Sequence, residues 1–281
     1  MKLDRLGWAA GIAFRSFGLR MGVRVTDTRA MDQVLNRLPP GWKPAASPIV
    51  DHLFSLVIGG AQQNSTVQRL NLAYYDAGRF ARGKDLECVL DVFETLLRLV
   101  VAKRARRRTF VHAGVVSWNN RAILIPGRSF SGKTTLVTKL VQAGAKYYSD
   151  EYAVIDEHGL VHPFALPLGV REEGEIDGGR VDIASLGGVP GAAPIAVALV
   201  LSTSYRRGAK WRPRELSHGN GVLELLARTV SARSQTKLAL QSLPNAIRSA
   251  TVLKGVRGEA DDLVETILER VSLRKVRPKL S

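Results

Sequence analysis

Residues 123–137 read Ile-Leu-Ile-Pro-Gly-Arg-Ser-Phe-Ser-Gly-Lys-Thr-Thr-Leu-Val, an apolar run that passes through glycines into a segment opened by a lysine and two threonines. Gly127, Gly132, Lys133 and Thr134 fill the phosphate-loop pattern G-x-x-x-x-G-K-[ST]. In such a loop the glycines let successive backbone amides curve around an anion, and the following helix adds the positive end of its dipole. Lys133 can then reach the terminal phosphates of a nucleotide, and the Thr134 hydroxyl can bind Mg²⁺. The pattern therefore predicts a site for ATP and Mg²⁺.

The segments on either side of the loop strengthen this prediction, since the pattern requires a strand before it and a helix after it. Residues 122–125 are apolar, and residues 134–143 have a helical pattern. The alternative is an ordinary Gly/Ser-rich turn followed by a helix cap. Arg128 inside the loop either adds a phosphate contact or points to solvent. We expect the nucleotide to contact the whole loop: Gly127, Arg128, Ser129, Phe130, Ser131, Gly132, Lys133, Thr134 and Thr135.

Polar residues before and after the loop complete a predicted phosphoryl-transfer site. Such a site needs clamped phosphates, Mg²⁺ held by a hydroxyl and a carboxylate, and a base beside the acceptor hydroxyl. Asp150 and Glu151 end the strand that follows the loop helix, which is where those carboxylates must lie. His112 opens the strand before the loop and is the third candidate. The alternatives are a structural histidine, a turn-capping Asp150, and a Glu151 that points away from the metal because strand residues alternate in direction.

Three segments together resemble the catalytic domain of the bacterial HPr serine kinase/phosphorylase family. They are His112-Ala-Gly-Val-Val, the loop itself, and Tyr148-Ser-Asp-Glu-Tyr-Ala-Val-Ile155, and the resemblance covers roughly residues 105–270. The resemblance implies an α/β fold with a P-loop kinase core related to that of phosphoenolpyruvate carboxykinase. It also implies that Asp150 is the base that acts on an acceptor serine and that Glu151 lies near the metal.

By the same resemblance, His112 approaches the terminal phosphate. The metal ligands are then expected to be Thr134, Asp150 and Glu151. Within these segments the chain departs from the family at three positions: Arg128 stands where the family has aspartate, Phe130 where it has glycine, and Glu151 where aspartate is usual. The family's C-terminal signature is not recognisable around residues 169–194, and the N-terminal module differs from the family's. Because that family forms rings, self-association into a homo-oligomer is expected.

Residues 1–105 are expected to form a small α+β module that carries no chemistry, beside a catalytic domain over residues 106–281. In the module, alternating apolar residues predict a strand over 17–25, and a long apolar stripe predicts a helix over 86–106. Its other predicted elements are a helix over 29–38, strands over 53–58 and 67–75, and a turn over 75–78.

The predicted catalytic domain alternates strands and helices. An uninterrupted apolar run over 195–202 predicts its central strand, and the Gly-rich residues 172–194 predict a surface loop or lid. The other predicted strands are 110–118, 122–125, 146–149, 152–155 and 250–253; the predicted helices are 134–143, 221–233, 236–248 and 261–271.

The composition is that of a globular protein with a strong basic excess. Of 281 residues, 45% are hydrophobic and 23% are charged, and the formal net charge is +16. The excess gathers in residues 103–108, 206–214 and 270–279, which favours solvated faces and a basic tail. An acidic peptide, a nucleotide phosphate or an anionic membrane surface are the other partners it fits.

The single cysteine, Cys88, excludes disulfides within the chain and fits a reducing compartment. Its helical surroundings predict a buried position. No apolar run reaches the roughly 18 residues that a spanning helix requires, and residues 6–14 are too short and too closely followed by arginines for a secretory segment. We therefore expect a cytoplasmic protein without a transmembrane segment.

These features favour an ATP-dependent, Mg²⁺-requiring kinase that phosphorylates a hydroxyl, serine above all, on a small protein or peptide, and the basic excess favours an acidic one. One alternative is a P-loop module that binds or hydrolyses nucleotide without a phosphoacceptor. The other is a basic protein that binds nucleic acid or a membrane surface. Nucleic acid is the less favoured partner because the basic clusters lack interleaved aromatic residues.

Overall fold

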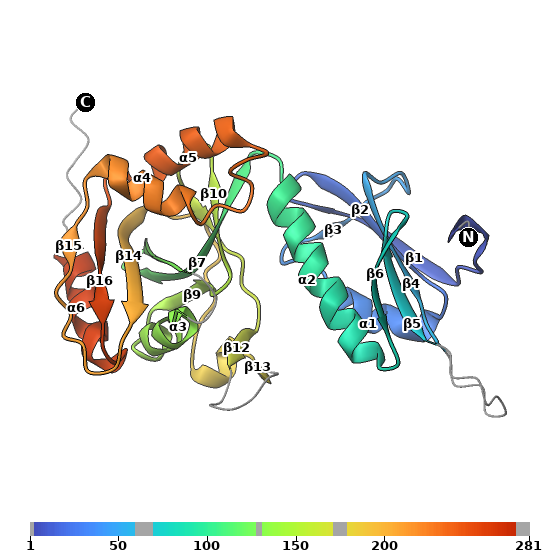
Figure 1. The fold of residues 1–281 in the computed structure, drawn as a ribbon, viewed down its shortest axis with the longest axis horizontal. Helices are drawn as coiled ribbons and strands as arrows, with labels where there is room; N and C mark the ends of the chain where they lie inside the picture. The colour runs from blue at the N-terminus through green and yellow to red at the C-terminus, as the bar shows by residue number, and fades with distance from the viewer. Residues whose placement is uncertain (1–2, 60–69, 128–130, 171–178, 274–281) are drawn as a thin grey trace. The chain divides into compact units, whose positions relative to one another are not determined.

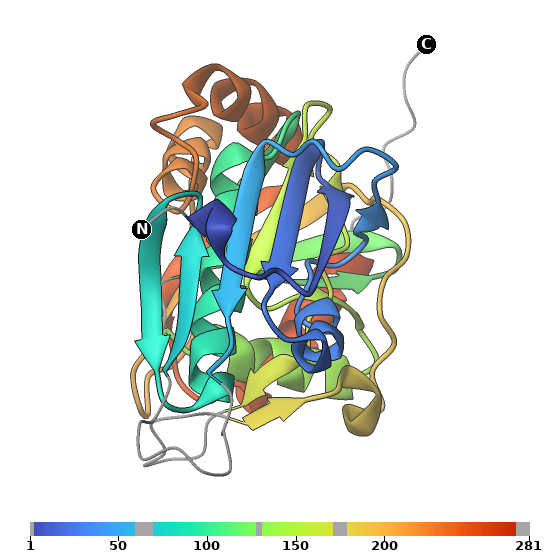
Figure 2. The ribbon, with the colours of Figure 1, turned by 90° about the vertical axis from the view of Figure 1, so that its right-hand side faces the viewer.

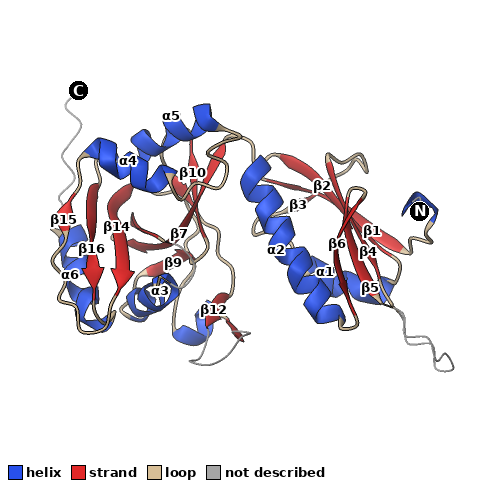
Figure 3. Cartoon of the chain, viewed as in Figure 1, coloured by secondary structure: helices blue, strands red, loops and turns tan. Residues whose placement is uncertain are grey.

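The computed structural model describes residues 3–59, 70–127, 131–170 and 179–273. The chain divides into two compact units, Met1–Arg106 and Arg107–Ser281, and both combine helices with β-sheets. Figures 1 and 3 show their elements. No helix within the described residues is both long and apolar enough to span a membrane.

The first unit is a six-stranded sheet in the order β3-β1-β2-β4-β5-β6, which Figure 2 shows face-on. Helix α2 packs on this sheet, and the Phe93 ring of α2 meets the Phe54 ring of β4 edge-to-face at 5.4 Å between centroids. The elements are η1 Leu3–Arg5, β1 Ala10–Ser16, β2 Leu19–Val25, η2 Thr28–Ala30, α1 Met31–Leu35, β3 Lys43–Pro44, β4 His52–Val57, β5 Asn71–Tyr75, β6 Gly78–Gly83 and α2 Leu86–Arg104.

The predictions for this unit are confirmed in part. The strand predicted over 17–25 begins only at Leu19, because Phe17 and Gly18 have φ values of 47° and 81° and form the turn from β1 into β2. The helix predicted over 29–38 is a short 3-10 turn followed by α1, and the Asp27 side chain caps its start. The prediction that Cys88 is buried is wrong: it lies on the exposed side of α2.

The second unit is built on an eight-stranded sheet in the order β11-β10-β7-β8-β14-β16-β15, with β9 also paired to β7. Its strands are β7 Arg108–Trp118, β8 Arg121–Pro126, β9 Lys146–Ser149, β10 Tyr152–Asp156, β11 Val161–His162, β14 Val197–Tyr205, β15 Arg214–Glu215 and β16 Thr251–Arg257. A separate ribbon pairs β12 Leu168–Val170 with β13 Gly179–Val181. The helical elements are α3 Lys133–Gln142, η3 Ile183–Leu186, α4 His218–Leu226, α5 Thr236–Ile247 and α6 Asp261–Ser272.

Helices cover both faces of this sheet. Leu136 of α3 and Leu263 of α6 pack into one apolar core with Ile123 of β8. Leu225 of α4 and Leu243 of α5 pack into a second core on the opposite face (Figure 1). Because successive residues of β8 contribute to the two cores in turn, the apolar run that was predicted to be a buried strand is buried on both sides.

Sheet topology places the predicted loop at an edge where several strands end. Strand β14 pairs in parallel with β8 on one side and with β16 on the other, as expected for a central strand. The carboxyl ends of β8, β14 and β16 therefore meet at one edge of the sheet, where α/β proteins bind ligands. On the other side of β8, strand β7 is antiparallel and pairs in turn with β9 and β10.

Most predicted elements of this unit lie within a few residues of their observed bounds, with two main differences. The helix predicted over 221–233 ends at Leu226, since Thr229 pairs with Val111 and the Val230 amide donates to the Phe110 carbonyl of β7 at 2.9 Å. The predicted lid over 172–194 lies partly outside the described residues. Its described part contains β13 and η3.

Candidate functional site

The phosphate-loop segment joins β8 to α3. Gly132 is the N-cap of α3 and has φ 76° and ψ 18°, a left-handed conformation that glycine adopts without steric cost. Lys133 and Thr134 in the first helical turn are half-buried, and Thr135 is exposed. Arg128, Ser129 and Phe130, which were predicted to contact the nucleotide, lie outside the described residues.

Backbone hydrogen bonds bring the predicted site segments together. The Gly127 amide donates to the His112 carbonyl at 3.3 Å, and the Ala113 amide donates to the Glu151 carbonyl at 3.3 Å. The His112 amide in turn donates to the carbonyl of Arg228, which follows α4, at 2.9 Å. The beginning of the loop, the histidine and the acidic pair are thus parts of one bonded framework.

The charges of both predicted carboxylates act on Lys133. Burial lowers the pKa of its ammonium group; the negative charges of Asp150 and Glu151 oppose that shift, and the positive charge of Arg228 adds to it. Lysine charge, acidic pair and Arg228 therefore share one electrostatic environment. Arg228 was not among the predicted site residues.

The His112 ring lies beside the same lysine. It is tilted by 37° against the Tyr152 ring, with 4.8 Å between centroids. Desolvation lowers the pKa of His112, the Lys133 charge lowers it further, and a hydrogen bond with the Glu151 backbone opposes both. The imidazole is exposed on one side. A lowered pKa makes it neutral near pH 7, so that it can offer a hydrogen bond without adding a charge.

Asp150 is oriented by a buried tyrosine that the sequence analysis did not single out. The Tyr147 hydroxyl lies 2.9 Å from Asp150 Oδ1 and also 2.9 Å from the Leu166 carbonyl, and can donate to either oxygen. Burial, together with the Asp150 charge, raises the pKa of the Tyr147 phenol, which keeps it a hydrogen-bond donor. Tyr147 is on the short strand β9, Lys-Tyr-Tyr-Ser, three residues before Asp150, and nothing in that sequence indicated a role at the site.

The turn between β9 and β10 fixes the acidic pair. Its anchor is the buried Ser149, whose hydroxyl accepts hydrogen bonds from the Glu151 amide at 3.1 Å and the Tyr152 amide at 2.9 Å. Asp150 and Glu151 are both half-buried. Each carboxylate is held on a short, internally bonded turn, which is the rigid support that a catalytic acid or base needs.

The described part of the loop fits a phosphate group. A side chain at Gly127 would place its Cβ 2.4 Å from Ser131 Oγ, so only glycine leaves the serine in place. Ser131 Oγ is itself buried and has no hydrogen-bond partner among the described residues. A buried hydroxyl without a partner is costly unless a ligand provides one, and a phosphate oxygen would do so.

The expected metal ligands also fit Mg²⁺, although they are too few to hold the ion without phosphate or water. Within the described ranges no group of three or more His, Cys, Asp or Glu side chains could hold a metal by itself. Mg²⁺ is commonly held by one or two carboxylates together with substrate phosphates and water. Thr134, Asp150 and Glu151 suit that kind of site.

Arg257 is a second residue that sequence reasoning missed. It ends β16, far from the loop in sequence, yet its Nη2 donates to the Gly132 carbonyl at 2.8 Å and its Nη1 to the Gly258 carbonyl at 2.9 Å. The side chain is only 2% exposed, and its Nε has no partner among the described residues. Burial lowers the pKa of the guanidinium. The sequence signal that could have identified Arg257 as a site residue is a charged residue at the end of a strand with apolar residues.

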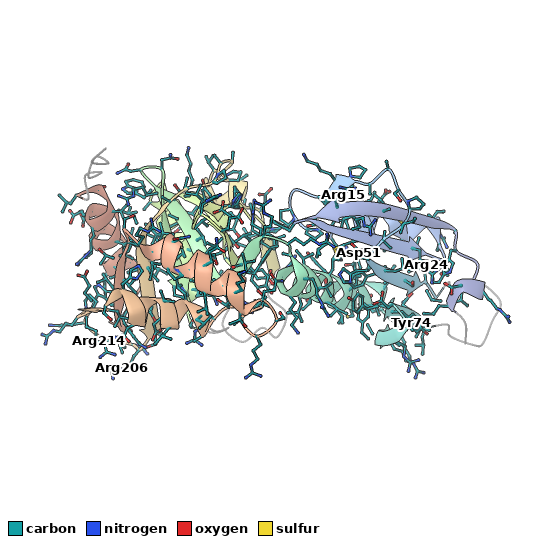
Figure 4. All side chains as sticks on the ribbon, turned by 90° about the horizontal axis from the view of Figure 1, so that it is seen from above. Arg15, Arg24, Asp51, Tyr74, Arg206 and Arg214 are labelled. Atoms are coloured by element: carbon teal, nitrogen blue, oxygen red, sulfur yellow. The ribbon has the colours of Figure 1, made fainter. Side chains whose placement is uncertain are left out.

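Arg206 and Arg207, which could stabilise charge, directly follow β14. Arg206 and Arg207 are exposed, and Figure 4 shows Arg206 and Arg214 extending outward from this unit. Arg171 lies outside the described residues. A cavity of about 770 Å³ between α3 and α6, beside Trp118, includes none of the predicted site residues.

Comparison with known proteins gives distant structural likenesses. No family model matches the chain, and no curated protein matches it. Among solved structures, the Hpr(Ser) kinase/phosphatase from Coxiella burnetii is 18% identical over 58% of this chain and 93% of its own length, with a TM-score of 0.32. The relationship is distant, and the assignment of site residues stays a prediction.

Proposed function

We propose that the second unit is an ATP-dependent, Mg²⁺-requiring kinase that transfers the γ-phosphate to a hydroxyl, serine above all, of a small protein or peptide. The observation that supports this most is the shared environment of Lys133, Asp150, Glu151 and His112 at the end of the loop. These are the groups that phosphoryl transfer needs: a cation for the phosphates, carboxylates, and a hydrogen-bonding imidazole.

Each residue has a defined task in the proposed reaction. The loop amides and Lys133 hold the β- and γ-phosphates. Asp150, oriented by Tyr147, accepts the proton of the acceptor hydroxyl. At the same time the oxygen of that hydroxyl forms a bond to the γ-phosphorus. The bond from that phosphorus to the β-phosphate bridging oxygen breaks, and ADP leaves with the electron pair. His112 offers a hydrogen bond to the transferring group.

Mg²⁺, when bound by Thr134 and an acidic residue, neutralises part of the phosphate charge. The reaction therefore needs both the acidic pair and the loop hydroxyl in place. The basic excess of the chain favours an acidic acceptor.

The experiment that tests this proposal is incubation of the protein with γ-labelled ATP, Mg²⁺ and the small proteins or peptides encoded beside it. We expect one of them to take up label on a hydroxyl, and Lys133→Ala to prevent it. Loss of ATP without any labelled product would favour the alternative, a nucleotide-hydrolysing module without a phosphoacceptor. Absence of both ATP binding and turnover would overturn the proposal.

A further inference from the structure

We infer that the cavity following β14 and β16 binds the nucleoside end of the nucleotide, its base and ribose. This inference rests on the proposed function. The cavity has a volume of about 380 Å³, within the usual range of roughly 300–1,000 Å³ for small-molecule sites. It is formed by residues 208–211, after β14, and residues 257–259 with Asp262 and Leu263, after β16.

Strand order fixes the direction in which a bound nucleotide extends. The loop leaves β8, and the acidic pair lies between β9 and β10, both of which pair with β7 on one side of β8. Strands β14 and β16 lie on the other side. A triphosphate whose terminal phosphate faces Asp150 must therefore extend its nucleoside toward the carboxyl ends of β14 and β16, where the cavity is.

Arg257 connects the loop to this cavity. Its guanidinium lines the cavity and also donates to the Gly132 carbonyl at the start of α3. A buried cation of this kind is expensive unless opposite charge compensates it, and the Glu259 carboxylate acts on it electrostatically. A phosphate entering between loop and cavity would supply further negative charge. Arg257 is thus placed to contact the phosphate next to the ribose.

Trp211 gives the cavity an aromatic wall. A Cβ at Gly255 of β16 would lie 3.0 Å from Trp211 Cζ3, so the glycine lets the indole lie directly on the strand. The rest of the indole is half-buried and lines the cavity. Every base can stack on such a ring, which makes the wall suitable for a base without fixing which one.

Two carboxylates of the cavity suit the ribose. Glu259 and Asp262 both line the cavity, and the Glu259 carboxylate already accepts a hydrogen bond from the Tyr205 hydroxyl at 2.8 Å. Carboxylates at the ends of parallel strands are common partners of ribose hydroxyls. The cavity thus combines an aromatic side chain, carboxylates and a buried cation, which are the kinds of group that contact the base, the sugar and the phosphate of a nucleotide.

The test compares the affinities of ATP and inorganic tripolyphosphate, both with Mg²⁺, by calorimetry on the full chain. Tripolyphosphate offers the loop the same phosphates but has no nucleoside. We expect Trp211→Ala to weaken ATP between about 5- and 150-fold, the loss typical of one stacked base, and to leave tripolyphosphate affinity unchanged. Trp211→Phe should retain most of the ATP affinity.

A matched control is Trp118→Ala, since Trp118 is also half-buried and packs against the same apolar core, yet lines the other cavity. It should leave the affinity of both ligands unchanged. Equal losses for ATP and tripolyphosphate in Trp211→Ala, or no loss for either, would overturn the inference while leaving the proposed kinase intact. Wild-type protein that bound neither ligand would overturn both.

Photo-crosslinking provides a measurement that does not depend on the stability of any variant. Irradiation of the wild-type protein with 8-azido-ATP and Mg²⁺ should attach the probe within residues 205–214 or 257–263, as mapped by mass spectrometry of the digest. Attachment confined to other segments would refute the cavity as the nucleoside site.

Discussion

Asp150 is the residue on which the proposed chemistry depends most directly. Replacing it with asparagine keeps the shape and the Tyr147 contact but removes the base. We expect Asp150→Asn to bind ATP and to lose about 10²- to 10⁴-fold in transfer rate, the usual contribution of general-base catalysis. Single-turnover assays with labelled ATP measure this. Asp261→Asn, an exposed change on α6, is the control, and full transfer activity in Asp150→Asn would contradict the mechanism.

Tyr147 acts on the reaction through Asp150 and is a positioning residue. Tyr147→Phe removes the hydroxyl 2.9 Å from Asp150 Oδ1 and leaves the buried ring in place. Because hydrogen bonds to charged groups contribute about 1.5–3 kcal/mol, we expect kcat to fall roughly 10- to 100-fold with little change in the KM for ATP. Steady-state kinetics test this split. A rise in KM alone would show that the tyrosine supports binding and not the base.

His112 should make stability depend on pH. Its folded-state pKa is below the ordinary value of about 6.5, so near and below that pH the unfolded chain binds the proton more readily. Stability from this site is therefore present above pH 6.5 and is lost as the pH falls. Urea unfolding at about pH 7.5 and 5.5 should show a smaller drop for His112→Gln than for wild type. If the free energy of unfolding fell equally in both proteins, His112 would not contribute to the pH dependence of stability.

At the scale of elements, the close contact between β7 and α3 supports the loop helix. A Cβ at Gly114 of β7 would lie 2.5 Å from Val137 Cγ2 of α3. Gly114→Val should push α3 away and destabilise the protein by about 1–3 kcal/mol. Chemical denaturation measures this free energy. Gly219→Ala in α4, where an added Cβ meets nothing within 4 Å, is the matched control and should not destabilise.

Local signals predicted the elements around the loop well. The strand β8 and the helix α3 have patterns contained in a few adjacent residues, and they were found with bounds shifted by no more than a residue or two. Strands β1 and β6 were missed, since their arginines and glycines obscure the alternation and their identity depends on pairing with β2 and β5. The end of α4 was misplaced because β7 captures the following backbone.

The candidate site was predictable where the loop pattern sets the spacing, as for Lys133 and Asp150. Arg228 and Arg257 reach the same place from 95 and 124 positions beyond Lys133 in sequence, and only the order of strands brings them there. Tyr147 was missed for a different reason, since its hydroxyl matters only because the β9–β10 turn directs Asp150 toward it.

At the scale of the whole molecule, the net charge of +16 bears on the alternative that the protein binds nucleic acid or a membrane surface. Several basic side chains are already paired with carboxylates, as in Arg20–Asp51 at 2.7 Å, Arg107–Glu157 at 2.5 Å and Lys139–Asp261 at 2.9 Å. Figure 4 marks Arg15 on the first unit and Arg206 and Arg214 on the second; all three are exposed, so exposed basic side chains occur on both units.

We therefore expect weak affinity for duplex DNA. Fluorescence anisotropy at 50 and 200 mM salt measures it. A DNA-binding protein with six to ten phosphate contacts would lose about 10³- to 10⁵-fold in affinity between these concentrations. Tight binding at low salt with a loss of that size would revive the nucleic-acid alternative.

The exposed position of Cys88 on α2 has a practical consequence. The chain contains no other cysteine, so a thiol-reactive dye would attach to the natural protein at one known place, in the unit without predicted chemistry. Emission from such a reporter, followed while nucleotide is titrated, would reveal whether events at the loop are communicated to the N-terminal module.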